Sequence, residues 1–180
     1  IRQADMALRQ AKEENGSCCR VFDGSMLKSI DRSYAIREQL NHAMSRQEFY
    51  LEYQPVFDIR QHPVTIVGYE ALLRWEGPVL GRVSPGEFIP VVENSNLILP
   101  LGQWVLEEAC LFSAREHQRT GQFAQVAVNL SVRQLTQPDF VGLVQATLTR
   151  TGVPAEALQL EVTESLLMTD FEKNAACLAQ

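Results

Sequence analysis

The chain has 180 residues, of which 46% are hydrophobic and 21% charged, the balance of an ordinary globular domain. Its formal net charge of -6 argues against binding to a nucleic acid polymer, because such binding needs a basic face. No apolar run approaches the length of a membrane span, and the first residues do not resemble a signal peptide. We therefore expect no membrane contact from this segment.

The cysteines indicate the compartment. Their spacing contains no CxxC pair, so we interpret them as small buried thiols in a reducing cytoplasm. They are Cys18, Cys19, Cys110 and Cys177. The predicted location is cytoplasmic, with a membrane anchor upstream in a longer parent protein left open.

The residues before Phe49 predict two helices around a short strand. Ile1–Asn15 has its apolar residues on one helical stripe, and Cys18–Asp23 has the pattern of a short strand. Ser25–Gln47 places apolar residues at helical spacing among charged ones, as a connecting helix would, and we interpret its arginines as facing solvent. A domain boundary is expected near residues 23–25.

From Phe49 onward the chain alternates strands and helices. Two predicted strands, Phe49–Asp58 and Val64–Trp75, are joined by a connection short enough for an antiparallel hairpin. The later elements are expected in the order helix, helix, strand, helix, strand and helix: Pro85–Glu93, Leu101–Arg119, Gln125–Ser131, Pro138–Thr151, Leu158–Thr163 and the residues from Asp170. Thr120-Gly121 is expected to end the second of these helices, and Gly152 the third. This alternation favours right-handed crossovers and a parallel sheet, so the predicted fold class is α/β.

The strand Val64–Trp75 carries an acid and a base on the same face. Side chains alternate along a strand, so Glu70 and Arg74 share one face, and the face that ends in Trp75 is apolar enough to pack under helices. A carboxylate and a guanidinium late in a buried strand cost desolvation free energy that packing alone does not require. The pattern indicates a functional site.

Polar side chains also lie late in other predicted strands. Asn129 follows a Val/Ala run, and Glu161 lies late in a short apolar strand with Glu164 just beyond it. In the first strand, Gln54 lies on the face opposite to that of Tyr53. Parallel sheets build active sites at the carboxyl ends of their strands in this way. Any one of these residues could be a strand-end polar group in water, but that interpretation is weaker for all of them together.

An ordered series of short motifs runs from Phe49 to Gln180. Its members are Tyr53-Gln54-Pro55, Glu70-Ala71-Leu72-Leu73-Arg74-Trp75, Ser84-Pro85-Gly86-Glu87-Phe88-Ile89-Pro90, Leu101-Gly102-Gln103-Trp104-Val105-Leu106, Val128-Asn129-Leu130-Ser131 and Glu161-Val162-Thr163-Glu164-Ser165. The series resembles the EAL family of cyclic di-GMP phosphodiesterases. Residues 4–23 are similar to the closing helix and strand of a GGDEF diguanylate cyclase domain, although Arg9 and Ser17-Cys18-Cys19 depart from its pattern.

The resemblance implies a modified TIM (β/α)8 barrel with one antiparallel strand, of which about the first half is present. It divides the chain into a GGDEF remnant at residues 1–24, a connecting helix at 25–48 and the N-terminal half of an EAL domain at 49–180. The family's next segments, an Asp-Asp-Phe-Gly strand end, a Lys and a further Glu, are not in the chain.

The resemblance also implies hydrolysis of cyclic di-GMP to the linear dinucleotide pGpG by a two-metal mechanism with Mg²⁺ or Mn²⁺. These ions take oxygen ligands, and Glu70, Asn129 and Glu161 are the implied metal ligands. The implied catalytic residues are Glu70, Glu161 and Glu164. Glu164 would orient a neighbouring loop, although a helix-capping role is equally open.

Substrate contacts are implied for Gln54, Leu72 and Arg74. A guanidinium at Arg74 can bind two phosphate oxygens at once. We interpret three aromatic residues, Trp104, Phe112 and Phe123, as part of the hydrophobic core. We interpret Glu76 and Glu87 as solvated loop carboxylates.

Two functions remain open. The first is part of a bacterial phosphodiesterase, and the second is a catalytically silent GGDEF–EAL module that binds cyclic di-GMP as a receptor or regulator. The intact Glu70 favours the enzyme. Residues 1–180 alone are expected to be inactive and to self-associate as homo-oligomers, because half a barrel leaves unpaired sheet edges.

Overall fold

The computed structural model describes residues 8, 11, 19, 21–60 and 62–162 of the chain. Within the predicted first helix, Leu8 and Ala11 are helical, and the helix predicted from Asp170 lies outside the described residues. The strand predicted over Cys18–Asp23 is wrong where it can be checked, because residue 19 and residues 21–23 are irregular. Val21 is 82% exposed, and a β-run without a neighbouring strand has no hydrogen-bond partners to hold it extended.

Helix α2 spans Gly24–Ala43. The Asp23 carboxylate accepts a hydrogen bond from the backbone N–H of Met26 at 3.2 Å, which caps the first turn. The helix ends four residues before the predicted end at Gln47, because Gln47 adopts a left-handed φ of 56° and the N–H of Glu48 bonds back to Ala43 O at 3.0 Å. This turn directs the chain into the first strand.

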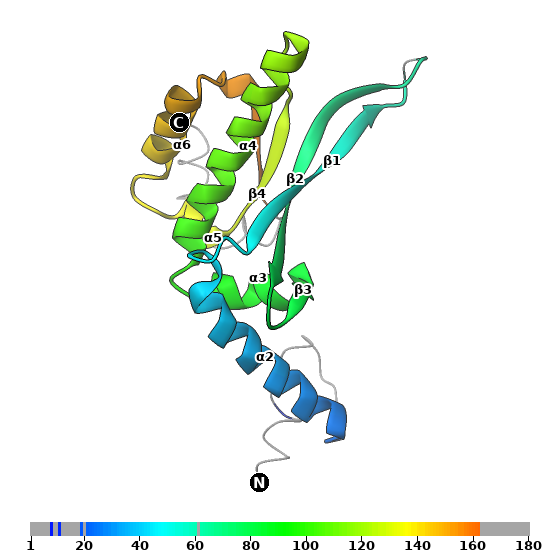
Figure 1. The fold of residues 1–180 in the computed structure, drawn as a ribbon, viewed down its shortest axis with the longest axis vertical. Coiled ribbons are helices and arrows are strands. Elements are labelled where there is room, and N and C mark those ends of the chain that lie inside the picture. Colours follow the sequence, from blue (N-terminus) through cyan, green and yellow to red (C-terminus); the bar gives the residue numbers. More distant parts are fainter. Residues whose placement is uncertain (1–7, 9–10, 12–18, 20, 61, 163–180) are drawn as a thin grey trace.

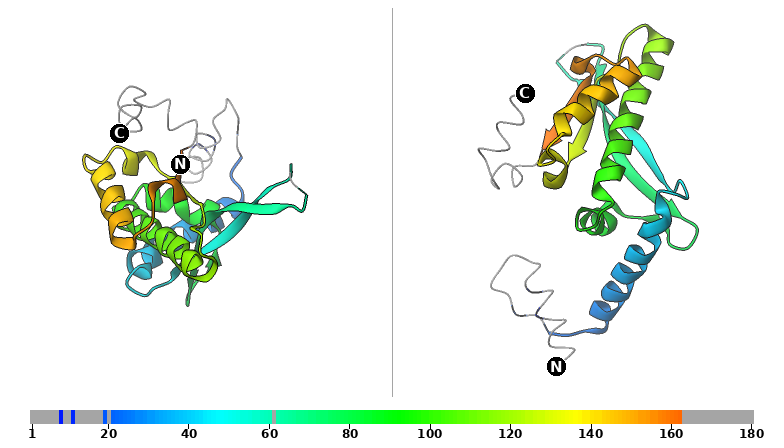
Figure 2. Two further views of the ribbon diagram at one scale, coloured as in Figure 1. Left: turned by 90° about the horizontal axis from the view of Figure 1, so that it is seen from above. Right: turned by 90° about the vertical axis from the view of Figure 1, so that its left-hand side faces the viewer.

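Strands β1 (Phe49–Asp58) and β2 (Thr65–Gly77) form the predicted antiparallel hairpin. Figures 1 and 2 show its tip projecting beyond the rest of the sheet. A third strand, β3 (Gly81–Val83), pairs antiparallel with the end of β2 and was not predicted. Three residues after a Gly/Pro-rich turn are too few to show a period-two pattern.

The helices and strands that follow agree with the predicted order. They are α3 (Pro85–Glu93), α4 (Ile98–Thr120), β4 (Val126–Leu130), α6 (Phe140–Thr151) and β5 (Leu158–Val162), with the short unpredicted helices α5 (Val132–Leu135) and η1 (Ala155–Ala157) between them. As their positions suggested, Gly121 and Gly152 end α4 and α6 in the left-handed conformation, with φ of 79° and 69°.

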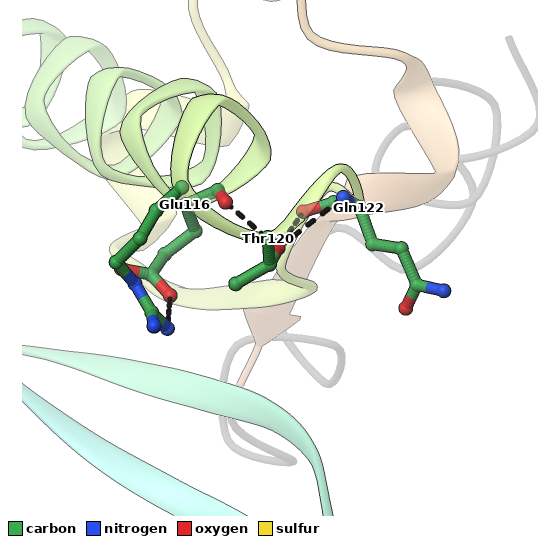
Figure 3. A network of polar contacts seen from close by, with 4 residues as sticks. Glu116, Thr120 and Gln122 are labelled. Atoms are coloured by element: carbon green, nitrogen blue, oxygen red, sulfur yellow. Dashed lines mark hydrogen bonds and ion pairs between the residues drawn. The ribbon is translucent and has the colours of Figure 1, made fainter.

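A polar network closes the C-terminal end of α4 (Figure 3). The Thr120 hydroxyl donates to Glu116 O at 2.8 Å and accepts from the N–H of Gln122 at 3.2 Å. The Glu116 carboxylate also pairs with Arg119 at 2.6 Å. This network satisfies hydrogen-bonding groups in the last turn of the helix. It lies apart from the strand ends described below.

The sheet has the strand order β1-β2-β4-β5, with β3 on the side of β2. Strands β2, β4 and β5 are parallel, and β1 is antiparallel to β2. Helices α4 and α6 lie together against one face of this sheet (Figures 1 and 2), and apolar side chains of β4, β5, α4 and α6 form a common core there. The α/β fold is therefore the predicted one, a barrel-like βα arrangement with a leading antiparallel strand.

A second core joins α2 and α3 to the end of the hairpin. Trp75 is fully buried against Phe49 and Phe88, and Ile36 and Leu40 of α2 pack into the same cluster. The second half of α2 is thus part of the folded unit. Within the part of the chain that the structure describes, no helix is both long and apolar enough to cross a membrane.

Candidate functional site

The register of the sheet brings the predicted polar residues to one face. Gln54 lies directly opposite Glu70 across the hairpin, Glu70 is in register with Ala127 on β4, and Asn129 is in register with Glu161 on β5. Neighbours in register point to the same side of a sheet, so these side chains share a face. Ala71 and Trp75 of β2 point to the opposite side and are buried, as predicted.

Glu70 and Asn129 are in direct contact. The side-chain amide of Asn129 donates a hydrogen bond from Nδ2 to Glu70 Oε1, with an N–O distance of 2.8 Å. Glu161 accepts a weaker bond from Gln159 Nε2 at 3.3 Å. Three adjacent parallel strands therefore present two carboxylates and one amide side by side, with Asn129 and Glu161 near the carboxyl ends of their strands and Glu70 near the middle of β2.

A small cavity lies beside these carboxylates. It has a volume of about 130 Å³, and both Glu70 and Glu161 line it together with Gly68 and Ala127. A Cβ at Gly68 would lie only 3.0 Å from Gln125 O, so a glycine at this position lets β2 and β4 approach closely under the cavity. A larger residue at position 68 would therefore crowd the backbone beside the predicted metal ligands.

A larger cavity of about 550 Å³ lies elsewhere. It is bounded by Phe49, Leu51 and Tyr53 of β1 and by Trp104 and Arg115 of α4, and none of the predicted site residues lines it. The larger hollow therefore belongs to the helix-covered side of β1 rather than to the face of Glu70.

Arg74 lies further along the same face as Glu70 and Leu72. Its guanidinium donates from Nε to Glu52 Oε2 at 2.6 Å and from Nη1 to Leu73 O at 3.0 Å, and its side chain is 17% exposed. The hydrogen bond from Arg74 holds the pKa of Glu52 below its ordinary value of 4.5, with a smaller contribution from Arg82. The guanidinium is thus oriented by a carboxylate of the neighbouring strand.

Glu52 was missed in the sequence analysis. Period two along β1 places it on the face of Gln54, which was a usable signal, but its partner depends on the hairpin register. That register sets Glu52 opposite Leu72 and Tyr50 opposite Arg74.

A buried polar contact fixes the end of β2 below the site. The Trp75 indole N–H donates to Glu48 Oε2 at 2.9 Å, and the Glu48 backbone carbonyl accepts from the N–H of Glu76 at 3.0 Å. Glu48 is 7% exposed, and Arg46 lies 3.7 Å from its other carboxylate oxygen. These contacts tie the end of α2 to the strand that carries Glu70 and Arg74.

The aromatic residues predicted to be core are core. Phe112 stacks on Tyr53 with ring centroids 3.7 Å apart, Phe123 packs into a third apolar cluster, and Trp104 packs against both larger clusters. Burial raises the pKa of Tyr53 to about 12, and its hydroxyl donates to Glu108 O at 3.1 Å. Tyr53 is therefore a neutral core residue beneath Gln54.

Glu87 was interpreted as a solvated loop carboxylate; it is exposed, but it lies in the first turn of α3 rather than in a loop, and it is paired. Its Oε1 accepts a hydrogen bond from Arg32 of α2 at 3.0 Å, and its Oε2 accepts from the N–H of Ser84 at 3.3 Å. The Arg32 hydrogen bond is the main cause that holds the pKa of Glu87 below 4.5. The pair connects α2 to the first turn of α3, so at least one arginine of the connecting helix does more than face solvent.

The family follows from comparison with known proteins. Residues 37–180 match the sequence profile described as the EAL domain. The chain belongs to the EAL domain family. Its match begins at residue 37, within α2, so the family unit includes the last turns of that helix.

The chain is also similar to curated proteins. The chain is 36% identical over 179 residues to the bifunctional diguanylate cyclase/cyclic di-GMP phosphodiesterase MucR of Pseudomonas aeruginosa, covering 98% of this chain and 26% of the relative. It is 42% identical over 146 residues to an uncharacterized protein of Mycobacterium tuberculosis, covering 80% of this chain and 47% of that protein. The chain thus spans less than half the length of these EAL relatives.

Solved EAL structures have the same fold. A structure named as the phosphodiesterase of MucR from Pseudomonas in complex with c-di-GMP superimposes with a TM-score of 0.75 at 36% identity, covering 81% of this chain and 58% of that chain. The FimX EAL domain of Xanthomonas citri, also in complex with c-di-GMP, gives a TM-score of 0.69 at 28% identity, covering 84% and 58%. The GGDEF interpretation of residues 1–24 stays a prediction.

The donor set of this EAL segment suits a hard divalent cation. Glu70, Asn129 and Glu161 offer only oxygen and amide groups, the ligand chemistry of Mg²⁺ and Mn²⁺. Among the described residues there is no group of three or more His, Cys, Asp and Glu side chains arranged to hold a metal, so the amide of Asn129 is needed for a third ligand here. Glu164 lies outside the described residues.

Proposed function

We propose that this segment is part of a bacterial signalling protein that hydrolyses cyclic di-GMP to linear pGpG. The observation that carries the proposal is the row of Glu70, Asn129 and Glu161 on adjacent strands, with Glu70 and Asn129 in hydrogen-bond contact at 2.8 Å. Membership of the EAL family and the relationship to MucR, which is named as a cyclic di-GMP phosphodiesterase, support the same substrate.

We assign Glu70, Asn129 and Glu161 to hold the divalent ions. When bound, Mg²⁺ or Mn²⁺ would neutralise charge on the phosphoryl oxygens and activate a water. The residues of this chain have the complementary task of fixing the ligand oxygens in place. The Asn129–Glu70 hydrogen bond orients one carboxylate, and the close approach of β2 and β4 at Gly68 keeps the strands in register beneath it.

Substrate positioning falls to the residues next to this row. Arg74, oriented by Glu52, would bind a phosphate of the dinucleotide, and Gln54 and Leu72 would contact the nucleotide from the same face. We assign Glu164 to orient a neighbouring loop, a role carried only by its place in the family motif. Turnover is proposed for the full-length protein, since the family's later Asp-Asp, Lys and Glu are not among these residues.

Hydrolysis and binding can be measured separately in the full-length protein. Incubation with cyclic di-GMP and Mg²⁺ or Mn²⁺ should yield pGpG, and titration calorimetry with Ca²⁺ in place of Mg²⁺ should report binding without turnover. Absence of both binding and hydrolysis would overturn the proposal.

The second candidate is a receptor that binds cyclic di-GMP without cleaving it. It is favoured by the solved FimX EAL domain, which is named for its complex with c-di-GMP rather than for an activity. Binding with Ca²⁺ and also with Mg²⁺, in the absence of any pGpG, would select the receptor over the enzyme.

Location and assembly complete the proposal. We place the protein in the cytoplasm, where Cys19 and Cys110, both free thiols, are stable. Self-association is proposed because β1 and β5 end the described sheet order, and each therefore offers unpaired backbone groups for a second copy.

A further inference from the structure

Glu52 lies between two arginines that come from two other strands. Its Oε2 accepts from Arg74 Nε at 2.6 Å, and its Oε1 accepts from Arg82 Nη2 at 2.9 Å. Glu52 belongs to β1, Arg74 to β2 and Arg82 to β3. One carboxylate therefore holds two guanidinium groups close together on the face of Glu70.

The hairpin registers explain why the three side chains meet. Glu52 is opposite Leu72, and Arg82 is opposite Glu76, so both side chains lie on the face of β2 that carries Glu70 and Arg74. Beyond the row of predicted metal ligands, this face thus carries two guanidinium groups at the end of β2, together with the carboxylates of Glu52 and Glu76. Glu52 accepts from both guanidinium groups, and the donors that it leaves unoccupied can bind an anion.

The donors of Arg74 are only partly used. Within the described part of the chain, the hydrogen bonds to Glu52 and Leu73 occupy Nε and one hydrogen of Nη1, and neither involves Nη2. A guanidinium held by Nε has its two terminal nitrogens fixed in direction, and these form the fork that matches two phosphate oxygens. Arg82 is 60% exposed, so its own terminal nitrogens can also reach a ligand.

We propose that Arg82 is a second phosphate-binding residue beside Arg74, and that Glu52 is the positioning residue that holds both guanidinium groups. The ligand class is the anionic phosphodiester of a cyclic dinucleotide. This inference rests on the proposed function, and it adds a residue of β3 and a residue of β1 to the substrate face.

A simpler role for Glu52 makes the opposite prediction. If Glu52 only neutralised the arginines, removal of its charge would leave a more positive surface and would strengthen binding of an anion. If it positions them, removal of its charge releases both guanidinium groups and weakens binding in spite of the added positive charge. The sign of the change in affinity separates the two roles.

The test is calorimetric titration of the full-length protein with cyclic di-GMP in the presence of Ca²⁺. Arg82→Ala should weaken binding about three- to tenfold, as expected for an exposed charge-assisted contact, and should reduce the dependence of affinity on salt. Glu52→Gln should also weaken binding. In an Arg74→Ala, Arg82→Ala background Glu52→Gln should have no further effect, because its action passes through those two residues.

Arg119→Ala is the matched control. Arg119 also pairs with a carboxylate, that of Glu116, at 2.6 Å, but it lies in the last turn of α4, the helix end that Figure 3 shows through Glu116 and Thr120. Helix α4 packs on the face of the sheet opposite to Glu70. This variant should bind as the wild type does. Unchanged binding by Arg82→Ala, or tighter binding by Glu52→Gln, would overturn the inference. A wild-type protein that does not bind at all would instead overturn the proposed function.

Discussion

Arg74 illustrates how strongly a functional side chain depends on its neighbours. It is held by Glu52 at 2.6 Å and by Leu73 O at 3.0 Å, so its guanidinium is fixed before any ligand arrives. A preorganised group loses little conformational freedom on binding, and most of its contact energy then contributes to affinity.

Arg74→Ala should therefore weaken binding of cyclic di-GMP by about 1.5–3 kcal/mol, the range of a hydrogen bond to a charged group. Titration calorimetry with Ca²⁺ measures this loss. Arg60→Ala is a suitable control, because Arg60 pairs with Asp58 at 2.9 Å near the hairpin tip and is 86% exposed. Equal affinities for wild type and Arg74→Ala would exclude the phosphate contact.

The Glu52 carboxyl gives a pH signature of the same contact. Its pKa in the folded protein lies below 4.5, mainly because Arg74 donates a hydrogen bond to it. The stabilisation from this pair is therefore fully present above pH 4.5 and is lost as the pH falls through the lower folded pKa. We expect the orientation of Arg74 to be independent of pH from neutral down to about pH 5.

Carboxyl NMR titration checks the assignment. In Arg74→Ala the pKa of Glu52 should rise, because the hydrogen bond from Arg74 is the main cause that lowers it. The pKa of Glu116, which Arg119 lowers, should not change in that variant. A Glu52 titration that is unaffected by Arg74→Ala would show that the two groups are not paired in solution.

At the scale of helices and strands, the sequence predicted the bounds of an element best where its hydrophobic pattern ends at a turn or at a helix-ending glycine. The bounds of β1 and α3 agree with the prediction, and Gly121 and Gly152 end their helices as expected. The short strand β3 and helix α5 were missed, because three or four residues carry no measurable periodicity. The early end of α2 is associated with the left-handed backbone of Gln47, which no sequence pattern predicted.

The candidate site, too, was predicted only in part. Local pattern correctly placed Asn129 and Glu161 late in their strands, whereas Glu70, also predicted late, lies near the middle of β2 because that strand continues to Gly77. The ion pairs of Glu52 and Glu87 depend on which residue lies opposite in another strand or helix. Long-range register is decided by the packed structure and not by local sequence.

The packing of α4 against α5 offers a test at this scale. A Cβ at Gly102 would overlap Nε2 of Gln134. Gln134 is buried, and its Oε1 accepts hydrogen bonds from Ser131 Oγ at 2.8 Å and from the Ser131 N–H at 3.1 Å. Gly102→Ala should destabilise the fold by about 1–3 kcal/mol through overpacking. It should also disturb the segment that immediately follows Asn129.

Chemical denaturation measures this effect. Gly86→Ala is the control, because a Cβ there meets only Ser84 Oγ at an ordinary 3.9 Å, and alanine is the better helix former. Gly86→Ala should be neutral or slightly stabilising. A Gly102→Ala variant as stable as the Gly86→Ala variant would mean that Gln134 can move aside at no cost.

At the scale of the whole molecule, the described chain forms an open sheet. The hairpin also carries exposed apolar side chains, including Phe57 at 49% and Ile66 at 50% exposure. Residues 1–180 alone should therefore form species heavier than 20.3 kDa and should show no phosphodiesterase activity. Sedimentation across a concentration series measures the first property.

Phe57→Lys places a charge on the exposed hairpin and should reduce self-association, since charged side chains are the usual protection of a sheet edge. A single 20.3 kDa species at every concentration would show that the segment closes its own edges. Turnover by the isolated segment would show that the later Asp-Asp, Lys and Glu of the family are not required for hydrolysis.

The central claim is that Glu70, with Asn129 and Glu161, forms a metal-dependent hydrolytic site. The most direct measurement is cyclic di-GMP turnover by the full-length protein with Mg²⁺, compared between wild type, Glu70→Ala and the remote control Glu116→Ala. Loss of groups that only support a metal ligand costs about 10–100-fold, so loss of a ligand itself should exceed about 100-fold. We predict that Glu116→Ala retains wild-type turnover and that Glu70→Ala folds but loses it. Turnover by Glu70→Ala within a few-fold of wild type would contradict the account.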